Sequence, residues 1–61
     1  MYAIDERVYV KDDEESNIFE AQIVAINAKE TLAFVVYETD HFYKERWVGF
    51  EDLSKIEEEV Q

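Results

Sequence analysis

The stretch "TLAFVVYE", Thr31 to Glu38, decides the fold because it gives the strongest strand signal in the chain. It contains three β-branched and two aromatic residues, with neither Gly nor Pro. This composition is typical of a strand in a packed sheet. Alternation along the strand predicts Phe34 and Val36 on the core face. Tyr37 then lies on the opposite face at the end of the strand, which favours a surface position for its ring.

Three further segments have the composition of strands, and they lie on both sides of the first. The longest of them mixes β-branched and small residues, and its alternation slips partway, as expected of a long strand that bends and serves two halves of a sheet. The segments run from Arg7 to Lys11, from Ile18 to Ile26 and from Glu45 to Gly49.

Turns are predicted between these segments. Asn27 to Glu30 is a hairpin turn in which Asn27 tolerates an unusual backbone angle, and Thr39 to Lys44 is a loop. Phe50 to Leu53 is predicted as a single helical turn, and beyond Ser54 both strand and helix stay open. Four or five short strands joined by tight turns predict an all-β fold. We expect a strongly bent antiparallel sheet that closes into a small barrel and thereby protects its edges.

The length and residue types argue against catalysis. A chain of 61 residues forms one small domain with a thin core, so a deep catalytic cavity is not expected; we expect an ordered core from about residue 5 to residue 57. The sequence has no Cys, one His, two Ser and no Gly-rich phosphate loop, so it predicts neither an enzyme nor a cofactor. The acidic run from Asp12 to Glu15 lacks the Gly and the distal Glu of a calcium loop, and it predicts a solvated loop without metal.

The net charge of −10 indicates the kind of partner. A negative field repels phosphate backbones, so nucleic acid is disfavoured and a basic peptide is a natural partner. The alternative is that the acidic residues only keep a small domain soluble. The apolar runs are shorter than the ~20 residues of a membrane span. The start "MYAIDERV" lacks the basic and apolar regions of a signal peptide, so an intracellular location is expected.

The order of segments resembles the chromo barrel, or Tudor-knot domain, of the wider Tudor family of chromatin and RNA-processing proteins. The resemblance runs from Asp5 to Ile56. It rests on an aromatic-Glu-Ala run at the start of the second strand, a Tyr that ends the third, and Trp-Val followed by an acidic turn; a plain Tudor domain explains that last part less well. These residues are Phe19, Glu20, Ala21, Tyr37, Trp47, Val48, Glu51 and Asp52.

The resemblance implies a five-stranded SH3-like barrel, often with a C-terminal helix, that acts as a monomeric binding module in nuclear chromatin complexes. Many members hold a methylated Lys or Arg in a cage of aromatic rings. Phe19 and Tyr37 match two cage positions directly. Two further cage positions fall on Asp40 and Lys44, which are not aromatic, and a shift of two or three residues brings Phe42 and Tyr43 to that place.

The sequence and the resemblance together predict a binding rim for a basic histone tail, with or without methyl-lysine. Trp47 is predicted to lie in the core, since one large ring can anchor a barrel this small. The alternative function is a scaffold domain of a chromatin-modifying complex that docks a partner protein without a modified residue. RNA binding occurs in similar Tudor-knot domains, but the net charge disfavours it here. The predicted rim consists of Phe19, Tyr37, Asp40, Phe42 and Tyr43.

Overall fold

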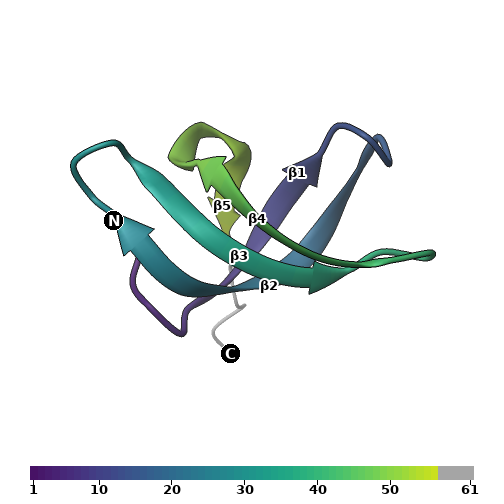
Figure 1. Cartoon of the computed structure of the whole chain (residues 1–61), viewed down its shortest axis with the longest axis horizontal. Helices are drawn as coiled ribbons and strands as arrows, with labels where there is room; N and C mark the ends of the chain where they lie inside the picture. The colour runs from purple at the N-terminus through teal and green to yellow at the C-terminus, as the bar shows by residue number, and fades with distance from the viewer. Residues whose placement is uncertain (57–61) are drawn as a thin grey trace, which may run out of the picture.

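A computed structural model of the chain describes residues 1–56 and shows one antiparallel sheet of five strands. The order across the sheet is β4-β3-β2-β1-β5, so β4 and β5 form its two edges (Figure 1). The sheet is bent into a barrel-like shape, as the sequence predicts. The strands are β1 (Arg7–Asp12), β2 (Asn17–Asn27), β3 (Leu32–Glu38), β4 (Tyr43–Gly49) and β5 (Leu53–Lys55), with a 3-10 turn, η1 (Phe50–Asp52), before β5.

Strand β1 alternates strictly between buried and exposed residues. Val8, Val10 and Asp12 are fully buried, and the residues between them face solvent. The prediction for this strand is confirmed, and the strand extends one residue further, to Asp12. Its last inward position is therefore filled by a carboxylate, which the barrel interior must neutralise.

Strand β2 contains the bend that its slipping alternation predicts. Ala21 and Ile23 are buried, and a register shift against β3 falls between Ile23 and Ala25. After this bulge Ala25 lies opposite Phe34, and Ile26 packs against the core instead. A bulge increases the local twist of a strand, so β2 can serve both halves of a curved sheet.

Strand β3 presents the opposite face from the one predicted. Ala33, Val35 and Tyr37 are buried, whereas Phe34 and Val36 lie on the outer face and are half-buried. The prediction was wrong because both faces of this strand are apolar, so alternation alone does not fix which one points inward. Of the three inward residues of β3, two (Ala33 and Val35) have side chains small enough for the narrow interior of a five-stranded sheet.

Trp47, in strand β4, is 50% exposed, so the prediction that it lies in the core was wrong. The strand begins at Tyr43, two residues earlier than predicted. Val48 is buried and alternation places Lys44 and Arg46 on the same inner face. The two large rings of the hairpin, Phe34 and Trp47, are cross-strand partners on the outer face.

The turns are mostly where the sequence places them. Residues 28–31 form the β2–β3 turn. The unusual backbone angle belongs to Thr31, with φ 55°, and not to Asn27. The Asn27 side chain accepts a hydrogen bond from the backbone N–H of Glu30 at 3.2 Å instead. The predicted helical turn is η1, and strand follows it to Lys55; the end of the chain after Ile56, where helix and strand stayed open, lies outside the described residues.

The core is built mainly from medium and small side chains. Each buried Val or Ile contributes about 1.5–3 kcal/mol through removal of apolar surface from water. The N-terminal segment adds a cover, since the Tyr2 ring packs edge-on against Phe50 at 5.3 Å and lies 4.8 Å from the Lys55 Nζ. Contacts with the core therefore begin at Tyr2. The buried apolar residues are Val8, Val10, Ala21, Ile23, Ala33, Val35, Tyr37, Val48 and Leu53.

Candidate functional site

A charged cluster, here named the Asp12 cluster, joins strands that are not neighbours in the sheet. It consists of Asp12 from β1, Tyr37 from β3, and Lys44 and Arg46 from β4. The Tyr37 hydroxyl donates to Asp12 Oδ2 at 2.6 Å, and Lys44 Nζ donates to the same oxygen at 2.9 Å. Arg46 Nη1 donates to the Tyr37 hydroxyl oxygen at 3.1 Å and lies 3.5 Å from Asp12 Oδ2. The cluster thus ties β1 to β4 across the interior of the bent sheet.

Asp12 carries its charge although its side chain is fully buried. Burial acts to raise the pKa of this carboxyl, but the hydrogen bonds from Tyr37, Lys44 and the backbone N–H of Glu15 outweigh it and hold the pKa far below its ordinary value. The hydrogen bonds of Lys44 to Glu14 and Asp12 raise the pKa of its ammonium. Burial and the bond to Asp12 raise the pKa of the Tyr37 phenol.

These pKa shifts leave no group in the Asp12 cluster poised to exchange a proton near neutral pH, which general acid–base chemistry requires. Within residues 1–56 every buried side-chain nitrogen and oxygen has a hydrogen-bond partner. The arrangement is that of a structural clamp that closes the interior of the sheet.

Two residues of the predicted rim belong to this interior. Tyr37 is only 4% exposed, and its hydroxyl is occupied by Asp12 and Arg46. Phe19 is half-buried and stacks on Tyr37, with ring centroids 6.1 Å apart and planes 22° from parallel. The prediction that Tyr37 presents an open ring at the barrel surface was wrong, because its phenol completes the Asp12 cluster.

The other three residues of the predicted rim are exposed and lie in or beside the β3–β4 turn. Phe42 and Tyr43 are each 60% exposed, and Asp40 is exposed as well. The Thr39 hydroxyl oxygen accepts from the backbone N–H groups of His41 at 3.1 Å and Phe42 at 3.0 Å, which fixes the turn. The predicted rim is therefore divided between a closed interior pair and an exposed group at the projecting end of the hairpin (Figure 1).

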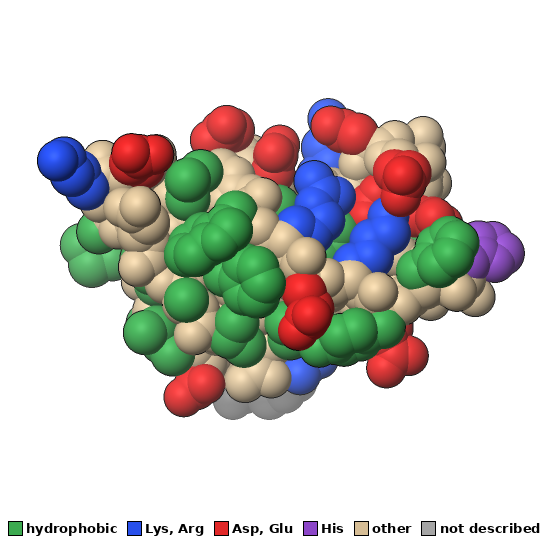
Figure 2. All heavy atoms as spheres, in the orientation of Figure 1, with side chains coloured by type: hydrophobic (Ala, Val, Ile, Leu, Met, Phe, Trp, Pro, Cys, Tyr) green, Lys and Arg blue, Asp and Glu red, His purple; other side chains and the backbone are tan. Residues whose placement is uncertain are grey.

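The outer face of β2, β3 and β4 carries a hydrophobic surface that the sequence did not predict. Phe34 and Trp47 lie side by side at its centre, with ring centroids 5.3 Å apart. Figure 2 shows hydrophobic side chains gathered over the β3–β4 hairpin, with acidic and basic side chains beside them. We name this surface the apolar outer patch; it consists of Val24, Ala25, Leu32, Phe34, Val36 and Trp47.

An outer groove of about 290 Å³ adjoins the apolar outer patch. Val36 belongs to both, and the exposed Tyr43 ring lies on the groove's β4 side. Glu20 pairs with Arg7 at 3.2 Å, while Glu38 is exposed beside Tyr43 on the neighbouring strand. The groove is lined by Arg7, Glu20, Gln22, Val36, Tyr37, Glu38 and Tyr43.

Acidic side chains border the apolar outer patch on the groove side. Glu45 is exposed and lies between Tyr43 and Trp47 on the outer face of β4. The cross-strand partner of Glu45 is Val36. Two residues further along the hairpin, Glu38 is the cross-strand partner of Tyr43. The patch and groove together thus change from apolar at Trp47 to negatively charged at Tyr43.

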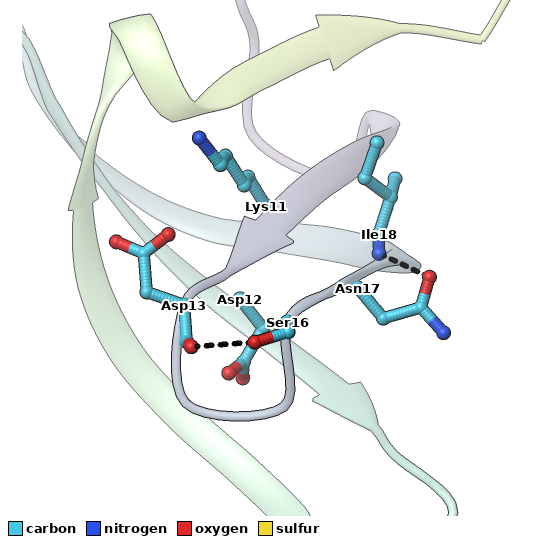
Figure 3. A pocket seen from close by; sticks show the side chains of 6 residues that line it. All are labelled: Lys11, Asp12, Asp13, Ser16, Asn17 and Ile18. Atoms are coloured by element: carbon cyan, nitrogen blue, oxygen red, sulfur yellow. Dashed lines mark hydrogen bonds between the residues drawn. The ribbon is translucent and has the colours of Figure 1, made fainter.

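A larger hollow, of about 410 Å³, lies at the β1–β2 turn (Figure 3). It is lined by Lys11, Asp12, Asp13, Ser16, Asn17 and Ile18. The side chains of Asp12 and Asp13 point in different directions in Figure 3, and the Asp12 carboxylate is already bound within its own cluster. In the described part of the chain, no group of three or more acidic or His side chains is arranged to hold a metal ion.

The edges of the sheet are poorly suited to pair with another strand. On β4 the inner positions hold Lys44 and Arg46, and inward-pointing charges on an edge strand oppose pairing with another chain. The other edge, β5, has only three residues. The outer face of the hairpin is consequently the better candidate for a binding surface.

One signal in the sequence could have revealed the apolar outer patch. Residues 32–37 of β3 form a continuous apolar run, which is typical of a strand covered on both faces. The core covers only one face here. The sequence indicates the interior position of Asp12 only weakly. Asp12 continues the alternation of Val8 and Val10, but it lies in an acidic run, which is typical of a solvated loop.

Comparisons with known proteins do not assign this chain to a family. No family model matches it, no curated protein matches it, and no solved structure matches it. Among residues 1–56, no helix has the length and hydrophobicity needed to cross a membrane.

Proposed function

We propose that this chain is a non-enzymatic binding module that holds a basic segment of a partner protein on the outer face of its β3–β4 hairpin. The observation that carries the proposal is the apolar outer patch, centred on a half-exposed Trp47 and bordered by Glu45 and Glu38. Exposed aromatic surface next to charge of one sign is typical of a protein-interaction site.

Physical chemistry supports a basic partner in particular. A cation over the face of Trp or Tyr gains about 0.5–2 kcal/mol, and Trp is the best of the aromatic rings for this interaction. Trp47 and Tyr43 have exposed rings, and Glu45 lies between them on the same face. Since the chain as a whole carries a charge of −10, its field also attracts a basic segment before contact.

A histone tail is one basic segment that the resemblance to chromo barrels implies, and that identification stays a proposal, as does a nuclear location. A cage formed by all five predicted rim residues has no support, because Tyr37 is buried and its hydroxyl is hydrogen-bonded. The geometry supports the alternative more strongly, which is docking of an unmodified partner segment.

The test uses the fluorescence of Trp47, the only Trp in the chain. Peptides built from Leu, Ser and Arg, peptides with Lys or trimethyl-lysine in place of Arg, and acidic peptides with Glu in place of Arg would be titrated at low and physiological salt. We expect the basic peptides to change the emission, with weaker binding at physiological salt because exposed charges more than about 8–10 Å apart become screened. The acidic peptides should have no effect.

Two results would overturn parts of this proposal. If no basic peptide changed the Trp47 emission or the NMR signals of the outer face, the docking surface would be wrong. If only trimethyl-lysine peptides bound, and they shifted the Phe19 and Tyr37 signals, the methyl-lysine cage would be right after all. A matched Trp47→Phe variant, followed by NMR, shows whether the indole is needed.

A further inference from the structure

We infer that the docked segment lies extended along the outer face of β4 and carries one apolar residue, with basic residues two and four positions away from it on one side. Either chain direction satisfies this pattern. The inference rests on the proposed function and adds the chemistry and spacing of the ligand.

The spacing comes from the outward positions of β4. Trp47, Glu45 and Tyr43 are separated by two residues each along one strand. At about 3.3 Å per residue, Glu45 is roughly 7 Å from Trp47, and Tyr43 is roughly 13 Å from it. An extended peptide presents alternate side chains to one face with the same period, so its residues i, i+2 and i+4 can each meet one of these positions.

Each position offers a different environment. Each outward residue of β4 forms a row with its cross-strand neighbours. The first row holds Trp47, Phe34 and Ala25, with the Trp47 and Phe34 rings packed together, so it accepts an apolar side chain. The next row pairs Glu45 with Val36, which suits the apolar stem and charged head of a Lys or Arg.

The third row pairs Tyr43 with Glu38 and opens into the outer groove. A ring face and a carboxylate together favour a second basic side chain there. The three rows therefore form a gradient from apolar to anionic in steps of two residues.

A helical ligand fits this surface less well. An amphipathic helix presents an apolar stripe over at least two turns, which is more than 10 Å of length. Here the carboxylate of Glu45 follows Trp47 after only about 7 Å. A helix that lay along β4 from Trp47 would place part of its apolar stripe over Glu45 and Glu38.

The register is tested with two peptides of identical composition, and a third peptide tests a helical ligand. The in-register peptide is acetyl-Ser-Leu-Ser-Arg-Ser-Arg-Ser-amide, and the shifted peptide is acetyl-Ser-Leu-Arg-Ser-Arg-Ser-Ser-amide. A third, Ala-based peptide places Leu and the two Arg residues four apart, at helical spacing. Binding is measured by Trp47 fluorescence and by NMR of the full chain. We expect the in-register peptide to bind about two- to fivefold more tightly than either other peptide, since a contact between solvent-exposed opposite charges is worth up to about that factor.

A double-mutant cycle then locates the second basic residue. Glu38→Gln is combined with replacement of the last Arg by citrulline, its uncharged counterpart. Each single change should weaken binding about two- to fivefold, and the two together should cost clearly less than the product, because both remove the same contact. Asp13→Asn, which makes the same change of net charge at the β1–β2 turn, serves as the control and should show no coupling with citrulline.

The outcomes separate this inference from the proposed function. Equal binding of all three peptides would overturn the register and leave the docking surface standing. Tightest binding of the helical peptide would overturn the extended ligand. Absence of binding by every basic peptide would overturn both.

Discussion

The two faces of the β3–β4 hairpin use the same two strands in opposite ways. The inner face holds Ala33 and Val35 and contributes to the Asp12 cluster, where the buried Asp12 is paired with Lys44 and Arg46. The outer face carries the larger rings of Phe34 and Trp47, with Trp47 half exposed. The difference shows that, in a barrel this small, ring size does not identify the core. Large rings left outside, beside carboxylates, are available to a partner.

The largest expected effect comes from the inner face. Asp12→Ala leaves Lys44 and the Tyr37 hydroxyl without their shared acceptor. Removing one partner of a buried charged network typically costs about 3–5 kcal/mol, which is close to the whole stability of a domain of this size, about 3–5 kcal/mol. We expect the variant to lose the circular dichroism of the sheet at room temperature.

The control for this variant is Asp13→Ala, which removes the neighbouring, exposed carboxylate. Its free energy of unfolding in urea should change by no more than about 0.5 kcal/mol. A stable Asp12→Ala protein would mean that the interior tolerates the loss of its charge, and the contrast between the two faces would then rest on packing alone.

The fold could be predicted from the sequence to a large extent, but the face that each strand turns inward could not. The strand and turn segments follow from β-branched runs and from polar residues such as Asn27, which are local signals. The orientation of β3 depends on which of two apolar faces fits the interior, and that depends on neighbouring strands. Tyr37 was placed on the wrong face for this reason, whereas Trp47 was placed in the core because of the size of its ring.

The candidate site was harder to predict for the same reason. Phe42 and Tyr43 lie in the predicted polar loop from Thr39 to Lys44, where apolar rings are hard to explain as core, and both are exposed. The role of Tyr37 depends on Asp12, which lies 25 residues away in the sequence. No local pattern predicts such a long-range hydrogen bond, although continued alternation after Val8 and Val10 does point Asp12 inward.

A smaller effect is expected for Tyr37→Phe, which removes one hydroxyl and keeps the ring that stacks on Phe19. The hydroxyl donates to Asp12 and accepts from Arg46, so its loss should cost about 1–3 kcal/mol of unfolding free energy. The measurement is urea denaturation, compared with Tyr43→Phe on the outer face. Equal stability of the two variants would show that the phenol of Tyr37 contributes nothing to the cluster.

The same cluster predicts how stability depends on pH. The pKa of Asp12 is lowered by folding, so its contribution is fully present above the unfolded value of about 3.9. As pH falls below that value, the unfolded chain binds a proton that the folded protein does not, and stability decreases. We expect the unfolding free energy to decline below about pH 4, while the ¹³C carboxyl signal of folded Asp12 stays that of a carboxylate from pH 7 to pH 3. Titration of that signal near pH 4 would contradict the buried ion pair.

Only a moderate effect on stability is expected for Trp47→Ala, although Trp is the largest side chain in the protein. A fully buried Trp would cost about 3–5 kcal/mol on truncation, but Trp47 is half exposed and its main contact is the Phe34 ring at 5.3 Å. An aromatic pair of this kind contributes about 0.5–1.5 kcal/mol beyond the apolar area that it buries. The half-buried ring should therefore cost less than a fully buried one, and the variant should still fold and unfold in urea at a lower midpoint. Binding should change far more, because the ring is the apolar anchor of the outer face, and NMR titration with the in-register peptide should show a loss of about tenfold or greater. If the Trp47→Ala protein were unfolded, the result would show that this ring belongs to the core. A folded variant with unchanged affinity would instead separate the exposed ring from any role in binding.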